Sequence, residues 1–487
     1  MAKKKPTVET TSSAYETMRP KLSLIGTLMG GTEAMRAAGE LYLPKYAAET
    51  KTNYDVRLQR AVLYNAFMKT LESLVGKPFS KPMELKDDIP SGVLALTEDI
   101  DLRGNHIQMF ARKAFTEGLG KGLTHILVEY PTVPQGSVTS LAEERQMGAR
   151  PYWVQVQPED VIAAYAETVG GVEKLTHVRI CETVTERDGY GEVQVERIRV
   201  LEPGKWELWQ KGINSKWEKS DEGTTSLDYI PLLTFYADRQ SFMVSKPPLE
   251  DLAHTNVAHW QSSSDQRNIL TVTRFPILAA SGVASEESGK IVLGPNQFLT
   301  MSDPQGKYYY VEHDGAAIEA GRIDLQDLKE EMAMLGVELL QRTGTVTATE
   351  KAIDTAEGSS ALQSMVSTFV DFIEQALGVT ADWMGLGKDQ GGSVSINTEF
   401  GLSMNKATDL DVLLKARAAK EISHDTFIDE LMRRGVLDED FDDDEDKKLL
   451  ADENIKSLSD QAFLIKLQND GTVPPPTEPT KTASEGS

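Results

Sequence analysis

Apolar positions recur at helical spacing in three stretches between Pro247 and Gly385. The first stretch, LEDLAHTNVAHWQSSSDQRNIL, follows two consecutive prolines, which are favoured at the start of a helix because their missing N–H is not needed there. In the second stretch, apolar residues are spaced three or four positions apart, at Leu325, Leu328, Met332, Leu335 and Leu339. This spacing predicts one apolar stripe along a helix, with Asp324 as a suitable N-cap.

A third helix is predicted from the same spacing in Leu362, Met365, Phe369, Phe372 and Ala376. Between the first two helices, at about 273 to 321, apolar and polar residues alternate and turn residues are frequent, which predicts a small β-rich insert. The segment 342–358, RTGTVTATEKAIDTAEG, has no apolar periodicity, so we expect a loop between the second and third helices. Its threonines could line a pore, although an ordinary surface linker has the same composition.

The rest of the chain divides into helical and strand regions. Residues 14–86 and 104–120 have helical periodicity, and an apolar strand is predicted at 124–130. From 150 to 237 the period changes from 3.6 to 2, with turns at Asp188-Gly189 and Glu202-Pro203-Gly204, which predicts an antiparallel sheet. After 401 the pattern is helical again, with Ser423 as an N-cap and Gly435 beyond a C-terminus. This order of elements predicts the α+β class.

The charge of the chain is acidic but uneven. Against 51 Lys and Arg stand 75 Asp and Glu, a net of −24, yet residues 1–60 hold ten bases and six acids whereas 401–487 hold eleven bases and 20 acids. This balance argues against an open basic surface that grips nucleic acid by its phosphates. An acidic protein can still handle DNA that must slide, because repulsion prevents tight phosphate contacts, but solubility alone would also explain the acidity.

The single cysteine, Cys181, excludes an intrachain disulfide and a site built from several thiolates. We expect it to be a buried strand residue in a protein made in a reducing compartment. No apolar run predicts a signal peptide or a membrane-spanning helix. The tail 471–487 is rich in proline, serine and threonine, and we expect it to be disordered.

Sequence motifs for catalysis are not found. The segments 118–121 and 385–388 contain glycine and lysine but lack the spacing of a phosphate-binding loop. His254 and His259 are five residues apart, so on a helix they point away from each other and do not predict a zinc site. Because neither a nucleophile motif nor an assignable carboxylate pair occurs, we expect no enzymatic activity, no cofactor and no metal.

The order of these elements resembles the portal proteins of tailed bacteriophages, ring proteins at one capsid vertex through which the genome enters and leaves. ARPYWVQVQPEDVIAAYAE is similar to the entry into the wing sheet, PPLEDLAHTNVAHWQSSSDQRNILTVTRFPIL to the first stem helix, and GRIDLQDLKEEMAMLGVELLQ to the second. RTGTVTATEKAIDTAEGSS is similar to the tunnel loop, SALQSMVSTFVDFIEQALGV to the long helix behind it, and AAKEISHDTFIDELMRRGVL to the helical crown. The resemblance rests on their joint order rather than on any one segment.

The resemblance implies a portal fold with named regions. These are a wing at 1–245, helical at 14–130 and β-rich at 150–240; a first stem helix at 246–272; a clip at 273–321; a second stem helix at 322–341; a tunnel loop at 342–358; a long helix and wing return at 359–400; a crown at 401–470; and the tail from 471.

The resemblance also implies a function and partners. Twelve copies would form a ring in the virion, after synthesis in the bacterial host cytoplasm, and double-stranded DNA would pass through its channel without sequence specificity during packaging and ejection. The implied partners are a terminase motor, a head–tail adaptor, and the major capsid and scaffolding proteins, with no membrane. Because this chain lacks a phosphate-binding loop, the motor would supply the energy.

Candidate channel residues follow from the same resemblance. Lys329, Glu330, Glu331 and Glu338 would form a strip that faces the channel or a neighbouring stem helix, giving an acidic wall. Thr343, Thr345 and Thr347 would lie in the tunnel loop. Arg342 and Lys351, at the ends of that loop, would be the basic contacts to phosphates.

Two other interpretations remain open. One is an acidic cytoplasmic hydrolase with an unidentified carboxylate pair, which predicts a small oligomer and a pocket with perturbed carboxylates. The other is a different capsid or baseplate ring component, which would share the oligomer but not the order of stem, clip and tunnel loop.

Overall fold

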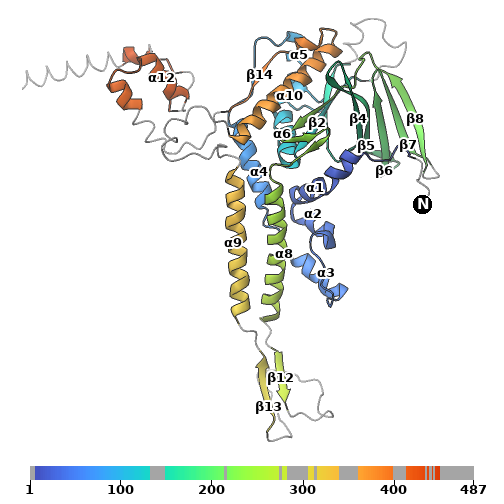
Figure 1. Cartoon of the computed structure of the whole chain (residues 1–487), viewed down its shortest axis with the longest axis vertical. Helices are drawn as coiled ribbons and strands as arrows, with labels where there is room; N and C mark the ends of the chain where they lie inside the picture. Colours follow the sequence, from blue (N-terminus) through green and yellow to red (C-terminus); the bar gives the residue numbers. More distant parts are fainter. Residues whose placement is uncertain are drawn as a thin grey trace, which may run out of the picture. The chain divides into compact units, whose positions relative to one another are not determined.

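A computed structural model describes residues 6–131, 149–212, 216–273, 277–281, 305–311, 315–338, 360–398, 413–433, 436–437, 441–442 and 445–449. The chain separates into two compact units, Met1–Leu402 and Ser403–Ser487, and each is described by itself. The first unit mixes helices with antiparallel sheets, in agreement with the predicted α+β class (Figure 1).

The helices of the first unit are α1 (Ser13–Met29), α2 (Gly31–Ala38), α3 (Lys51–Arg60), α4 (Ala66–Gly76), α5 (Ser91–Leu94), α6 (Ile107–Lys121), α8 (Glu250–Thr273), α9 (Ala316–Glu338) and α10 (Ala361–Trp383). The strands are β1 (Glu84–Leu85), β2 (Leu123–Glu129), β3 (Tyr152–Val156), β4 (Val161–Val169), β5 (Val172–Asp188), β6 (Gly191–Glu202), β7 (Lys205–Lys211), β8 (Trp217–Thr224), β9 (Leu232–Tyr236), β10 (Arg239–Ser241), β11 (Val244–Ser245), β12 (Ile277–Ser281), β13 (Lys307–Val311) and β14 (Val394–Ser395). All pairings among these strands are antiparallel.

The main core lies between a three-stranded sheet, ordered β3-β2-β9, and the helices α6 and α10. Both faces of β2 are covered, because all but its last residue are buried. α10 begins with a capping box, in which Ser360 accepts a hydrogen bond from the backbone of Gln363 while the Gln363 side chain accepts one from the backbone of Ser360. Its apolar side then packs on the sheet, as the spacing of Leu362, Phe369 and Phe372 predicts.

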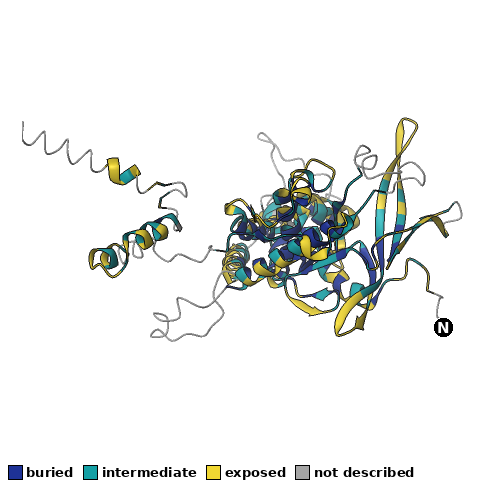
Figure 2. Ribbon diagram, turned by 90° about the horizontal axis from the view of Figure 1, so that it is seen from above, coloured by how far each residue is buried: buried dark blue, intermediate teal, exposed yellow. Residues whose placement is uncertain are grey.

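The second sheet is a five-stranded meander, β4-β5-β6-β7-β8. Two tight turns lie where they were predicted, and each holds a glycine at positive φ, Gly189 at 60° and Gly204 at 74°. Figure 2 shows buried residues concentrated in the body of the unit and exposed residues toward the free ends of the long strands. Cys181 lies in β5 as expected, but it is only half-buried, because it borders a small cluster that the N-terminal segment covers incompletely.

The long helices α8 and α9 pack side by side and project from the body, and the β12–β13 pair joins their far ends (Figure 1). Gly321 permits the close approach of the helices, since a Cβ there would lie 2.2 Å from Oε1 of Gln266 on α8. The buried Asn256 side chain ties α8 to the body. It accepts from the Phe67 backbone N–H at 3.0 Å and donates to the Tyr64 carbonyl at 2.9 Å.

The predicted start of the second long helix was wrong. α9 begins at Ala316, so Asp324 lies inside the helix, where it accepts a hydrogen bond from Ser262 Oγ at 2.5 Å, and the β-rich insert ends before 316. The turns of α9 that precede Asp324 contain good helix formers. Gln266 of α8 holds these turns by donating to the Ile318 carbonyl at 2.8 Å. The predicted apolar stripe itself faces α8 and α4: Met332 is buried, and Leu325, Leu328 and Leu335 are half-buried.

The helical periodicity predicted through 14–86 is not one continuous helix around 61–65, because the chain is extended between α3 and α4. Side chains satisfy the backbone there: Arg36 donates to the Ala61 carbonyl, Thr32 Oγ1 accepts from the Leu63 N–H, and Asn65 caps α4. Local polar side chains therefore compete successfully with a continuous helix.

The second unit contains α12 (His424–Arg433) and further helical residues at 413–418 and 445–449. Ser423 Oγ accepts from the Thr426 N–H at 3.1 Å, which confirms the predicted N-cap. Gly435 and the tail from 471 lie outside the described residues. Across the described part of both units, no helix combines the length and the apolar character that crossing a bilayer requires.

Candidate functional site

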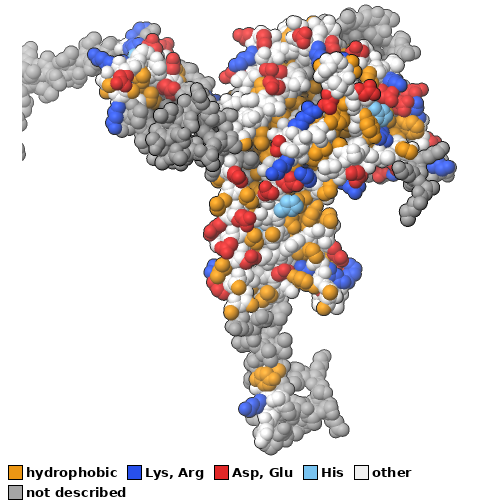
Figure 3. Space-filling model, in the orientation of Figure 1, with side chains coloured by type: hydrophobic (Ala, Val, Ile, Leu, Met, Phe, Trp, Pro, Cys, Tyr) orange, Lys and Arg blue, Asp and Glu red, His pale blue; other side chains and the backbone are white. Residues whose placement is uncertain are grey.

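α9 carries six acidic and two basic side chains, and four of the acids share one side of the helix. At roughly 100° per residue, Asp324, Asp327, Glu331 and Glu338 fall within about 60° of one another. All four are exposed, and within the described ranges none of them pairs with a cation. We call this set the acidic stripe. Figure 3 shows acidic side chains along α9.

The structure brings together only part of the strip that the sequence predicted. Glu331 and Glu338 belong to the acidic stripe, whereas Glu330 points about 80–100° away from them and accepts a hydrogen bond from Gln326 at 2.8 Å. Lys329 points to the other side, where its Nζ lies 5.1 Å from the centre of the Tyr64 ring. Three consecutive residues on a helix cannot share a face, which is why the predicted strip is divided.

Asp324 and Asp327 were missed as members of the stripe. Their spacing to Glu331 and Glu338, at i, i+3, i+7 and i+14, was visible in the sequence, but Asp324 had been interpreted as an N-cap outside the helix. The tunnel-loop candidates Arg342, Thr343, Thr345, Thr347 and Lys351 lie outside the described residues.

The electrostatic consequence of the stripe is a one-sided negative surface along α9. Exposed charges interact over about 10 Å at 0.1 M salt, so consecutive turns of the stripe reinforce one another. Such a surface repels a polyanion. It offers no geometry for binding an individual phosphate, because the acidic stripe itself contains no donor.

A pocket of about 250 Å³ lies between the two sheets and is lined by Arg199, Trp206 and Trp383, among others. Arg199 donates from Nε to Glu182 Oε1 at 2.6 Å and also pairs with Glu129. Burial and the adjacent Glu129 raise the pKa of the Tyr152 hydroxyl well above its usual value. Arg199 therefore engages the carboxylates of both Glu129 and Glu182.

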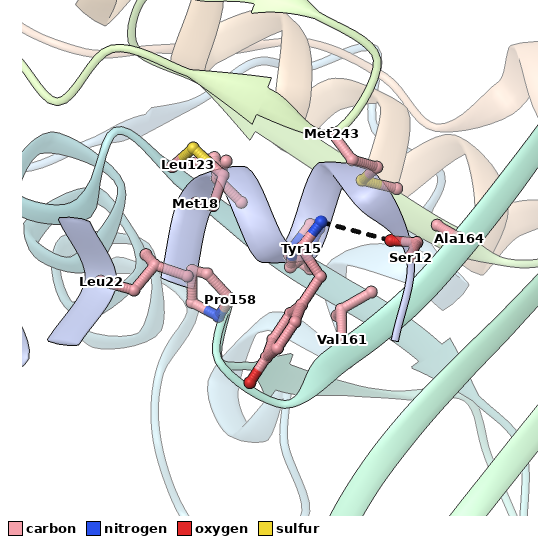
Figure 4. A pocket seen from close by; sticks show the side chains of 10 residues that line it. Ser12, Tyr15, Met18, Leu22, Leu123, Pro158, Val161, Ala164 and Met243 are labelled. Atoms are coloured by element: carbon pink, nitrogen blue, oxygen red, sulfur yellow. Dashed lines mark hydrogen bonds between the residues drawn. The ribbon is translucent and has the colours of Figure 1, made fainter. Parts of the chain in front are cut away.

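Another pocket, of about 20 Å³, has room for about one water molecule. It lies beneath the start of α1, where Tyr15 and Met18 face Val161 and Met243 (Figure 4). His125 on β2 also lines it and is 1% exposed. Burial lowers the pKa of His125 to about 3, and its Nδ1 lies 2.9 Å from Thr234 Oγ1.

We expect His125→Asn to reduce the loss of stability on acidification. In the wild type the unfolded chain takes up the His125 proton near pH 6.5, whereas the folded chain resists it to about pH 3, so the free energy of unfolding falls as pH decreases across this window. Between pH 6.5 and 5 this one group accounts for about 2 kcal/mol. Urea unfolding at pH 7 and pH 5 should show the difference, with exposed His254→Asn as the control. Equal losses in the wild type and His125→Asn would contradict a neutral buried His125.

Among the described residues, no group of three or more His, Cys, Asp or Glu side chains is arranged to hold a metal ion. His259 is buried beside Tyr64, and burial is the main reason that its pKa is lowered. His254 is exposed on a different side of α8.

Comparisons with known proteins give limited matches. A family model described as a domain of unknown function (DUF4055) matches residues 248–384, less than a third of the chain, from just before α8 to the end of α10. No curated protein matches the chain.

Solved structures similar to this chain include virion and neck chains of gene transfer agent (GTA) particles. One, from the neck of an empty particle computed with C6 symmetry, is 12% identical with a TM-score of 0.35, over 73% of this chain and 87% of that chain. One from the native virion is 11% identical with a TM-score of 0.35, over 87% and 99%. One from the neck of the native particle, computed with C12 symmetry, is 11% identical with a TM-score of 0.36, over 81% and 97%. At these identities and TM-scores the likenesses establish no function for this chain.

Proposed function

We propose that this chain is a virion ring protein, and specifically a portal protein, whose α8–α9 pair lines a channel for double-stranded DNA. Copies would surround the channel at one capsid vertex, through which DNA is packaged and later ejected. The chain would have no enzymatic activity of its own, and its energy would come from a terminase motor.

The observation that carries the proposal is the acidic stripe on a helix of the projecting pair. Double-stranded DNA carries one negative charge per about 1.7 Å of its axis, so a wall with unpaired carboxylates prevents it from adhering. A soluble surface helix also places its charges on the solvent side, but four of the six acids of α9 gather within one arc that contains neither of its two bases. A surface of this kind suits a duplex that must slide without being held.

The remaining partners follow from the position of each element in the proposed ring. The β12–β13 pair at the far end of α8 and α9 would meet the motor during packaging and the head–tail adaptor afterwards. The body would contact the major capsid and scaffolding proteins. Arg342 and Lys351 of the tunnel loop would make the basic contacts to phosphates.

Electron microscopy of the purified full-length protein in negative stain tests the ring. We expect ring-shaped particles with a central hole and a narrow stem. Compact particles without a hole would contradict the proposal.

Charge reversal tests the role of the acidic stripe. In Asp327→Lys/Glu331→Lys the channel wall becomes basic, and we expect the rings to bind double-stranded DNA at least tenfold more tightly than the wild type at 0.1 M salt, with binding lost as salt rises. The control Glu192→Lys/Glu218→Lys makes the same change of net charge on exposed positions of β6 and β8. DNA binding is measured by fluorescence anisotropy. Equal binding by both variants would show that charge in the acidic stripe affects DNA no more than charge elsewhere on the surface.

A further inference from the structure

The side of the first unit around α3 carries a basic surface that the proposed channel does not use. Lys45, Arg60 and Arg267 are exposed there and, in the part of the chain that the structure describes, form no ion pair. Two of the nearby acids are engaged, since Asp55 pairs with Lys51 and Glu49 with Arg57, while Glu40 is exposed near Tyr54 of α3. Among these cations lie the exposed apolar side chains of Tyr46, 50% exposed, and Val56, 42% exposed. We call this set the basic patch.

One face of α9, which we call the outer edge, is complementary to the basic patch in charge and also exposes apolar side chains. Ile323, Met334 and Val337 are 47%, 75% and 41% exposed, and at roughly 100° per residue they fall within about 40° of Glu330. Asp327 lies about 60° from Glu330, at the border of the acidic stripe. The outer edge therefore combines exposed apolar side chains with negative charge. Exposed apolar groups gathered on one helix face are typical of an interaction surface.

The basic patch and the outer edge lie on opposite sides of α8. Asp265 lies 3.6 Å from Arg57, and Arg267 donates to the Arg60 carbonyl at 3.2 Å, which together hold α3. Ser262 and Gln266 point to the other side and hold α9. The three helices therefore lie in the order α3, α8, α9, as Figure 1 shows, with basic side chains over α3 and acidic ones along α9 in Figure 3.

The same contacts fix the height of the two surfaces along α8. The residues of α8 that hold α3 and α9 all lie between Ser262 and Arg267, within about two helical turns. The upper part of the basic patch is therefore level with the outer edge near Glu319 and Ile323. Glu319 falls about 20° from Glu330 around the helix and pairs with Arg322, whereas Glu330 lies about 16 Å nearer the body. A second copy related by rotation about an axis parallel to α8 brings the two surfaces together without a shift along that axis.

We propose that the basic patch of one copy binds the outer edge of α9 on the next copy, so that the chain assembles head to tail through these two surfaces. The partner is a second copy of this chain. Opposite charges and exposed apolar side chains meet, and a contact between two different surfaces repeats around a closed ring or along a filament. This inference rests on the proposed ring and adds the residues that hold neighbouring copies together.

The proposed contact leaves the acidic stripe uncovered. The stripe is centred about 90° around α9 from Glu330, so a neighbour seated on the outer edge does not bury it. One helix thus serves two surfaces, one toward the next copy and one toward the channel. The positions of Ile323, Glu330 and Val337, seven residues apart, keep the contact surface separate from the stripe over the length of the helix.

Cross-linking of the full-length chain tests which surfaces meet. In a Cys181→Ser background, Arg60→Cys and Glu319→Cys are made separately and then co-expressed, and a short bismaleimide is added. We expect cross-linked dimers in the co-expressed sample and none in either single variant, because neither surface meets itself. Cross-links of equal yield in a single variant would indicate a two-fold contact and overturn the proposal.

Charge reversal gives a second measurement that does not depend on cysteine geometry. We expect Arg60→Glu and Glu319→Arg each to raise the concentration at which the oligomer dissociates by roughly tenfold, and the double variant to recover most of the loss. Exposed Lys113→Glu and Glu192→Arg are matched controls on α6 and β6 and should leave dissociation unchanged. Sedimentation velocity reports the result.

The outcomes separate this inference from the proposed function. Rings with a central hole that give no Arg60–Glu319 cross-link, and that tolerate both charge reversals, would overturn the contact and leave the ring intact. A wild-type chain that stays monomeric at all concentrations would overturn both.

Discussion

Replacing Phe369 by alanine should lower the free energy of unfolding of the first unit by about 3–5 kcal/mol. Phe369 is fully buried on α10, with ring centres of Phe115, Phe235 and Phe372 at 5.0, 5.2 and 5.7 Å. These rings belong to α6, β9 and α10, so the substitution opens a cavity where helices and sheet meet. Close packing on all sides leaves little scope for the site to collapse.

Urea unfolding followed by tryptophan fluorescence measures this effect, since Trp153 and Trp260 are buried in the same unit. Ser367→Ala is the matched control on α10, because Ser367 is exposed and bonds only to the preceding turn, and its effect should stay within about 0.5 kcal/mol. A loss below 1 kcal/mol for Phe369→Ala would show that this cluster does not hold the unit together.

We expect Arg57→Met to lower the free energy of unfolding of the first unit by about 3–5 kcal/mol. The Arg57 side chain is 3% exposed and the Glu49 side chain 9% exposed. Arg57 donates two hydrogen bonds of 2.9 Å to the Glu49 carboxylate and a third, of 2.8 Å, to the Pro44 carbonyl. Without Arg57 the Glu49 carboxylate remains buried and unpaired. Methionine preserves most of the packing volume, so the loss reports the charge rather than a cavity.

The pH dependence of this effect has a defined sign. The hydrogen bonds from Arg57 lower the pKa of Glu49, so the pair stabilises the fold above the carboxylate's unfolded pKa, and this stability is lost as pH falls through the folded pKa. The difference between the wild type and Arg57→Met should therefore grow from pH 4 to pH 7.

A second substitution identifies the cause. Adding Glu49→Gln to Arg57→Met should recover part of the loss at pH 7, because no buried carboxylate remains. Lys51→Met removes an exposed pair on the same helix and should change stability by less than about 1 kcal/mol. If the double variant is no more stable than Arg57→Met, an unpaired Glu49 is not the source of the cost.

The parts of the fold that follow from local pattern could be predicted from the sequence. The spacing of Leu325, Leu328, Met332 and Leu335 correctly predicts the side of α9 that packs inward, and Gly189 and Gly204 correctly predict two turns. Each of these signals is complete within a few turns of helix or a few residues of strand. Tertiary contacts reinforce them rather than override them.

The features that depend on distant partners could not be predicted. Nothing local indicates that β2 pairs with both β3 and β9, or that Arg36 and Thr32 hold the chain extended before α4. The start of α9 was misplaced because Gln266 on α8 holds its first turns. The same error hid Asp324 from the acidic stripe, so one misjudged boundary changed the candidate site.

Because Asn256 attaches α8 to the body near one end of the helix, a small tilt there produces a large displacement at the far end of the α8–α9 pair. Asn256 is the fulcrum, since both of its hydrogen bonds reach the segment that leads into α4. From there to Thr273 the helix extends about 26 Å, at 1.5 Å per residue. A tilt of about 5° at the fulcrum displaces the far end by about 2 Å, more than half the length of a hydrogen bond. The stiffness of this buried amide, together with the contacts of Asp265 and Arg267 with α3, therefore limits how far the β12–β13 pair can be displaced.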